Sequence, residues 1–170
     1  LVNQDFFGSA VASLGDLDGD GVTDLVVGAD HDSTGGPRRG AVHVQFMNAN
    51  GTVKSSVRIA SATNGGPTLA NYDQFGSSVA SLGDLDGDGV TDLVVGAENN
   101  DGAIYVLRMN ANGTVKSSTK IASDTNGGPT LADTDFFGSS VAAVGDLDGD
   151  SVTDLAVGAI FDNTNGSLRG

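Results

Sequence analysis

Three short segments, 16–24, 84–92 and 146–154, place aspartates at their first, third, fifth and ninth positions. Four carboxylates so close in sequence repel one another unless a cation lies among them. Hard oxygen donors on a flexible loop suit Ca²⁺ better than Mg²⁺, which requires a stricter octahedron and keeps its waters. The backbone carbonyl at the seventh position would add a further oxygen ligand, as in the first part of an EF-hand loop.

The segments therefore predict one Ca²⁺ each, three per chain. A metal-free Asp-Gly turn is the alternative for any one segment, and three matching copies argue against it. The twelfth position is valine, where an EF-hand has a bidentate glutamate, and the flanking residues favour strands over helices, so the scaffold is expected to be β. The predicted ligands are Asp16, Asp18, Asp20, Val22 and Asp24; Asp84, Asp86, Asp88, Val90 and Asp92; and Asp146, Asp148, Asp150, Val152 and Asp154.

The composition argues against nucleic acid as a partner and against disulfides and a membrane-spanning segment. The 170 residues carry a formal net charge of −14, and the eight basic residues form no patch, which argues against nucleic acid as a partner. There is no cysteine, hence no disulfide framework. No apolar run is long enough to span a membrane. Calcium sites of millimolar affinity belong outside cells, so we expect an extracellular or cell-surface protein.

The acidic segments belong to a longer repeat that opens with Phe-Gly at residues 7, 75 and 137. Within the first copy we expect four strands, at 9–14, 24–29, 41–47 and 53–60. The first has small residues that suit a crowded central axis, the second is apolar on both faces, the third alternates, and the fourth carries charges suited to an outer edge.

Four antiparallel strands repeated at this period predict an all-β fold of β-propeller blades; a β-solenoid is the alternative. The expected units are 1–60, 61–122 (crossing plus second blade) and 123–170 (crossing plus half a third blade). About two and a half blades are fewer than the four to eight that propellers usually have. We therefore expect either part of a longer propeller or a fragment that self-associates, most simply as a dimer.

The motif Phe75-Gly76, Gly83-Asp84 and then Asp92-Leu-Val-Val-Gly-Ala97 resembles the FG-GAP repeat of the integrin α-subunit propeller. The resemblance covers the whole chain in three motif copies. It implies a propeller fold with Ca²⁺ in the hairpin between the first two strands of each blade, on the face away from ligand. It also carries the family's aspartate ligands onto Asp16, Asp18, Asp20 and Asp24 and onto their equivalents in the other copies.

Two features separate these copies from one another and from integrins. Ser151 stands where the other copies have Gly21 and Gly89, and glycine suits the sharp turn better, so the third site is expected to be weaker. The first two copies are nearly identical over 7–29 and 75–97, which is typical of large bacterial surface or secreted proteins with FG-GAP arrays.

No catalytic set recurs along the chain. His31 and His43 have no nucleophile or carboxylate at a repeated spacing, and we expect both on the surface. We therefore predict a non-catalytic, calcium-binding, integrin-like propeller scaffold for protein interaction or adhesion. The alternatives are a carbohydrate-binding propeller, which the absence of tryptophan and the presence of only two tyrosines disfavour, and an accessory domain of a larger secreted enzyme.

Overall fold

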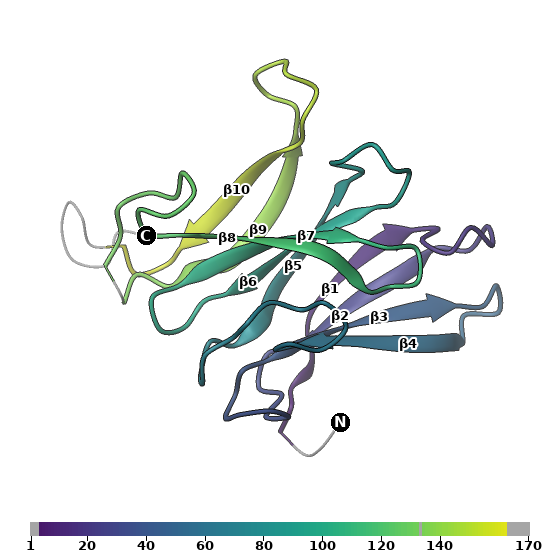
Figure 1. Cartoon of the computed structure of the whole chain (residues 1–170), viewed down its shortest axis with the longest axis horizontal. Coiled ribbons are helices and arrows are strands. Elements are labelled where there is room, and N and C mark those ends of the chain that lie inside the picture. The colour runs from purple at the N-terminus through teal and green to yellow at the C-terminus, as the bar shows by residue number, and fades with distance from the viewer. Residues whose placement is uncertain (1–3, 133, 163–170) are drawn as a thin grey trace.

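The fold consists of three antiparallel sheets arranged as an arc (Figure 1). A computed structural model describes residues 4–132 and 134–162, and within them every regular element is a strand. The strands are β1 (Phe7–Gly15), β2 (Asp24–Ala29), β3 (Ala41–Met47), β4 (Val53–Ala60), β5 (Phe75–Gly83), β6 (Asp92–Ala97), β7 (Ala103–Met109), β8 (Val115–Ala122), β9 (Phe137–Gly145) and β10 (Asp154–Ala159).

Each sheet is built from strands in chain order, so every connection within a sheet is a hairpin. The sheet orders are β1-β2-β3-β4, β5-β6-β7-β8 and β10-β9. In the first copy the expected bounds 24–29, 41–47 and 53–60 are confirmed, and the first strand extends beyond 9–14 at both ends, from 7 to 15. The all-β fold of two and a half propeller blades predicted from the sequence is therefore confirmed.

Residue pattern explains the place of each strand in its sheet. The apolar strands β2 and β6 lie inside their sheets and are almost wholly buried. The strands β4 and β8 form the outer edges, and their lysine-bearing halves face solvent, which discourages further strand pairing. The β2–β3 connection has eleven residues in the first sheet, whereas the β6–β7 connection has five.

Neighbouring sheets meet through their first strands, as expected for blades around a common axis. Strand β5 packs against β1 and β2, and β9 packs against β5 and β6. Glycines permit this close approach: a Cβ on Gly28 would lie 2.1 Å from the carbonyl oxygen of Gly76, and a Cβ on Gly96 would lie 2.1 Å from that of Gly138. Small residues in the Phe-Gly and Gly-Ala motifs thus set the spacing between blades.

Within residues 4–132 and 134–162 the core has two clusters, one centred on the first two blades and one between the second and third. Phe75 is fully buried and Phe137 is 6% exposed, because each packs on the preceding blade. The equivalent Phe7 is 46% exposed and Val11 is 64% exposed, so the outer side of β1 is uncovered in this chain. Among the described residues no helix is long and apolar enough to cross a membrane.

Candidate calcium sites in the β1–β2, β5–β6 and β9–β10 turns

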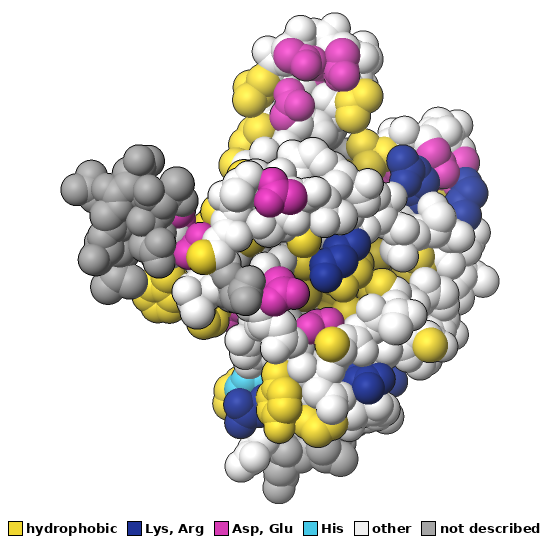
Figure 2. All heavy atoms as spheres, turned by 60° about the vertical axis from the view of Figure 1, so that its left-hand side comes forward, with side chains coloured by type: hydrophobic (Ala, Val, Ile, Leu, Met, Phe, Trp, Pro, Cys, Tyr) yellow, Lys and Arg dark blue, Asp and Glu magenta, His cyan; other side chains and the backbone are white. Residues whose placement is uncertain are grey.

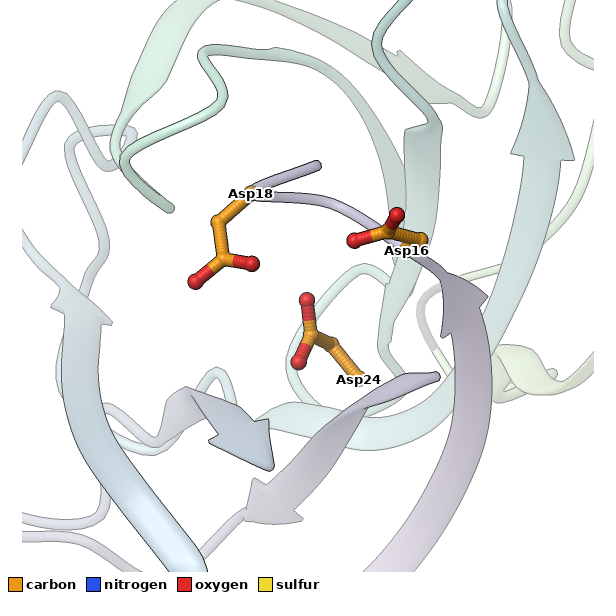
Figure 3. A group of neighbouring side chains, drawn as sticks. All are labelled: Asp16, Asp18 and Asp24. Carbon is orange, nitrogen blue, oxygen red and sulfur yellow. The ribbon is translucent and has the colours of Figure 1, made fainter. Parts of the chain in front are cut away.

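The first, third and ninth aspartates of each segment converge in the turn between the first two strands of a blade. One carboxylate oxygen from each of Asp16, Asp18 and Asp24 lies within 4.8 Å of the other two, and Figure 3 shows the three side chains directed toward a common point. The same holds for the equivalents in the other turns, Asp84, Asp86 and Asp92, and Asp146, Asp148 and Asp154. Three hard oxygens at this separation are suited to Ca²⁺.

The first aspartate folds the turn through its own side chain. Asp16 Oδ1 accepts hydrogen bonds from the N–H groups of Gly19 (2.8 Å) and Asp20 (2.9 Å), and Oδ2 accepts from Gly21 N–H (2.7 Å). Asp84 and Asp146 accept the corresponding bonds in their own turns. These contacts span five residues at most, which explains why the arrangement recurs in all three copies.

The ninth aspartate connects the turn to the rest of the blade. Asp24 is completely buried; its Oδ2 accepts from Leu17 N–H (3.0 Å) and its Oδ1 from Met47 N–H at the end of β3 (2.9 Å). Asp92 is also completely buried and accepts from Leu85 and Met109 N–H, at 2.9 Å each.

Asp154 lies half-buried in the third turn. Among the described residues, it accepts one such bond, from Leu147 N–H at 2.7 Å. The third sheet has no third strand in the part of the chain that the structure describes, so the second bond found in the other blades has no counterpart there.

The electrostatics of the second turn favour a bound cation. Burial raises the pKa of the Asp92 carboxyl, and the negative charges of Asp86 and Asp88 raise it further, although the two backbone hydrogen bonds act in the opposite direction. A carboxyl in such surroundings is costly to ionise without a positive partner. The donor chemistry, the spacing of the oxygens and the local charge therefore all fit Ca²⁺.

The fifth and seventh positions lie differently from the other predicted ligands. Asp20 and its equivalents Asp88 and Asp150 are outside the converging oxygen groups. Asp20 Oδ1 accepts from Val22 N–H (2.9 Å), while its Oδ2 lies 2.5 Å from Lys54 Nζ. That ammonium holds the pKa of the Asp20 carboxyl below its ordinary value. Coordination by these aspartates and by the carbonyls of Val22, Val90 and Val152 stays a prediction.

Two lysines next to the turns were missed by the sequence analysis. Lys54 on β4 lies 2.6 Å from Asp18 Oδ2, and Lys116 on β8 lies 2.8 Å from Asp86 Oδ2. The sequence offered a signal, since both lysines follow the valine that opens the fourth strand of their copies. Their interpretation as edge charges was incomplete because it ignored how the fourth strand returns toward the turn.

The surface location expected for His43 is wrong. Its side chain is buried on β3, edge-on to Phe7 with ring centroids 5.4 Å apart, and Nε2 has no hydrogen-bond partner among the described residues. Burial, followed by the positive charge of Arg58, lowers its pKa. His31 is partly exposed and lies 2.7 Å from the Gln74 side-chain amide.

A cleft of about 730 Å³ lies on the second blade, between the crossing from the first blade and the β6–β7 connection. Its polar lining includes Asn99, Asn100 and Lys120. Tyr105 also borders it but is 4% exposed, with its ring edge-on to Phe75.

Comparison with known proteins agrees with this architecture. The family model of the FG-GAP-like repeat matches residues 16–95 and 84–157, so the chain belongs to that family. It is 37% identical over 164 residues to integrin alpha-11 of Homo sapiens, which covers 91% of this chain and 12% of the relative. It is 32% identical over 167 residues to integrin alpha-4 of Xenopus laevis, covering 96% and 15%. A third relative, integrin alpha-5 of Xenopus laevis, is 33% identical over 171 residues, covering 97% and 16%.

The chain is thus an integrin α-like FG-GAP propeller segment. It spans only about an eighth to a sixth of the length of these relatives, namely 12%, 15% and 16%. The relatives are animal proteins, so the bacterial source expected from the near-identity of the copies finds no support in them.

Proposed function

We propose that this chain is a non-catalytic, calcium-stabilised propeller scaffold that serves protein interaction or adhesion at a cell surface or in a secreted protein. The observation that carries the proposal is the triplicate convergence of three aspartate oxygens in the turn between the first two strands of each blade. Membership of the FG-GAP-like repeat family and similarity to integrin α chains support the adhesive role and the extracellular location.

Calcium has a structural task in this proposal. Asp24 and Asp92 already link each turn to β3 or β7 through buried backbone hydrogen bonds. An ion held by the same carboxylates would join the turn, the second strand and the third strand into one unit. It would also offset the repulsion within a chain of net charge −14.

Calorimetric titration of chelator-treated protein with Ca²⁺ tests the proposal, together with elemental analysis of the metal retained after gel filtration. We expect three Ca²⁺ per chain. Absence of binding at millimolar Ca²⁺ would overturn the calcium function. Asp18→Asn, Asp86→Asn and Asp148→Asn, made one at a time, should each remove one ion from the stoichiometry.

The uncovered side of β1 favours a second copy of the chain as a binding partner. Phe75 and Phe137 are buried by the blade before them, whereas Phe7 and Val11 are exposed on the equivalent surface. A further blade of the same repeat, supplied by a second copy, would cover them. We therefore propose a dimer in solution, and sedimentation in Ca²⁺ over a wide concentration range tests it. A persistent monomer would contradict it, while Phe7→Asp should weaken any dimer that forms.

A glycan-binding function has weaker support. The cleft on the second blade has polar groups that could hold a sugar, but Tyr105 is too buried to present a ring face to one.

A further inference from the structure

The outer strand of each complete blade places a cationic side chain on the acidic turn. Lys54 Nζ lies 2.6 Å from Asp18 Oδ2 and 2.5 Å from Asp20 Oδ2. Lys116 Nζ lies 2.8 Å from both Asp86 Oδ2 and Asp88 Oδ2. The contact joins residues about thirty positions apart and recurs between equivalent atoms in two blades, so it is a built feature of the repeat.

The lysines and the proposed calcium require the same carboxylates. Asp18 contributes an oxygen to the converging group of the first turn and is also a partner of Lys54. Asp20, the predicted fifth-position ligand, has one oxygen on Lys54 and the other on the Val22 N–H group. An ion that recruited Asp18 and Asp20 fully would have to take them from the ammonium.

The positive charges of the lysine ammonium and of a bound Ca²⁺ ion disfavour the presence of both on the same carboxylates. A lysine held on two of the carboxylates would stand close to any divalent ion bound by those carboxylates, and like charges repel at short distance. The ammonium can leave at low cost, because the side chains of Lys54 and Lys116 are 39% and 43% exposed and end on flexible stems. Figure 2 shows two groups of acidic side chains on one face of the molecule. Those at the upper right have Lys or Arg side chains beside them, whereas those on the projection at the top have none beside them on that face.

We propose that Lys54 and Lys116 are built-in counter-cations that hold the ion-free turns together and compete with Ca²⁺ for Asp18 and Asp20, and for Asp86 and Asp88. The inference rests on the calcium function proposed above. Calcium binding then displaces each lysine into solvent and releases the turn from the outer strand. The lysines lower calcium affinity, and they limit carboxylate repulsion when calcium is scarce.

The test compares Lys54→Met, Lys116→Met and the double variant with the wild type. Calorimetric titration at low ionic strength should show roughly three- to tenfold tighter binding at the affected turns, because one repelling charge is gone. Lys120→Met is the matched control: it removes the same charge from β8, and Lys120 has no ion pair among the described residues. Its calcium affinity should match that of the wild type.

A second pair of measurements examines displacement itself. In chelator Lys54→Met and Lys116→Met should each melt at a lower temperature than the Lys120→Met control, since one turn has lost its counter-cation in each. Nitrogen-15 spectra of the lysine ammonium groups should shift at Lys54 and Lys116, but not at Lys120, when Ca²⁺ is added. Melting in saturating Ca²⁺ verifies that each variant folds, and Lys→Gln versions replace any that does not.

The outcomes separate the two proposals. If the wild type binds no Ca²⁺, the calcium function fails and the competition fails with it. If the wild type binds Ca²⁺ but the double variant binds it equally or more weakly, only the competition is overturned. Unchanged ammonium signals at saturating Ca²⁺ would overturn it as well.

Discussion

The first two acidic turns and the third have the same local structure but differ in what surrounds them. In all three, the first aspartate folds the turn through three backbone N–H groups. Asp24 and Asp92 are then buried and joined to a third strand, whereas Asp154 is half-buried and accepts a single turn bond among the described residues. The group of converging oxygens is therefore local in origin, whereas its connection to the blade is tertiary.

Calcium removal should give the largest effect and should separate the turns. Metal binding is coupled to folding where carboxylates repel without it, so chelation should lower the melting temperature by about 10 °C or more. Hydrogen exchange in chelator should rise first in the β9–β10 turn, because its ninth aspartate has the fewest anchors. Calorimetry and hydrogen exchange with and without Ca²⁺ measure these two effects. An unchanged melting temperature would show that calcium does not stabilise the fold.

Truncation of the ninth aspartate probes the anchors directly. Asp92→Ala should cost about 3 kcal/mol in chelator, because the N–H groups of Leu85 and Met109 lose a buried charged acceptor. Asp154→Ala should cost about 1 kcal/mol, since it leaves a single exposed N–H group, that of Leu147, without its acceptor. Urea denaturation of both variants in chelator gives the values. Equal losses would show that the tertiary anchors contribute little.

Two glycine substitutions compare a position packed against the next blade with the equivalent position in the third sheet. Gly96→Ala places its Cβ 2.1 Å from the Gly138 carbonyl oxygen, so the blades must shift, at about 1–3 kcal/mol. The Cβ of Gly158→Ala would lie nearest to Ser140 Oγ, at 2.4 Å, and that hydroxyl can rotate away. Denaturation midpoints should therefore fall for the first variant and barely change for the second. A similar loss at Gly158 would mean that the third sheet is also covered in solution.

A smaller contrast concerns His43 in the first blade and Tyr105, its counterpart in the second. Burial lowers the pKa of His43, so the unfolded chain binds a proton more readily than the folded chain does. This contribution destabilises the fold as the pH falls through the unfolded value of about 6.5. His43→Tyr should therefore lose less stability than the wild type between pH 7 and pH 5 in chelator. Identical pH profiles would show that His43 accepts its proton without cost.

The smallest expected effect is at the third turn. Ser151 has φ = 70°, in the left-handed region where Gly21 and Gly89 have 85°. Ser151→Gly should relieve about 0.5–1 kcal/mol of backbone strain and tighten Ca²⁺ binding at this turn several-fold. The matched reverse change, Gly89→Ser, should weaken the second turn by a similar factor, as titration of both variants would measure. Weaker binding after Ser151→Gly would contradict the assumed turn geometry.

Much of this architecture could be predicted from local pattern. Strands 24–29, 41–47 and 53–60 follow from apolar periodicity between turn residues, and the internal repeat transfers the same assignment to the second copy. The convergence of Asp16, Asp18 and Asp24 follows from a turn that these residues and their neighbours fold themselves. Spacing was sufficient for these three aspartates because the hydrogen bonds that fold the turn itself are short in sequence.

Contacts between distant segments could not be obtained in this way. The burial of His43 on β3, where its ring packs against that of Phe7, depends on the packing of distant strands, whereas its polar side chain indicated a surface location. The reach of Lys54 to Asp18 depends on the return of the outer strand across the blade. The strands, the repeat and the carboxylate turns can be read from the sequence, because they depend on periodicity and short-range hydrogen bonds. Which aspartates are buried and which lysines contact the turns follow from the fold, because solvent exclusion and charge pairing depend on segments distant in the chain.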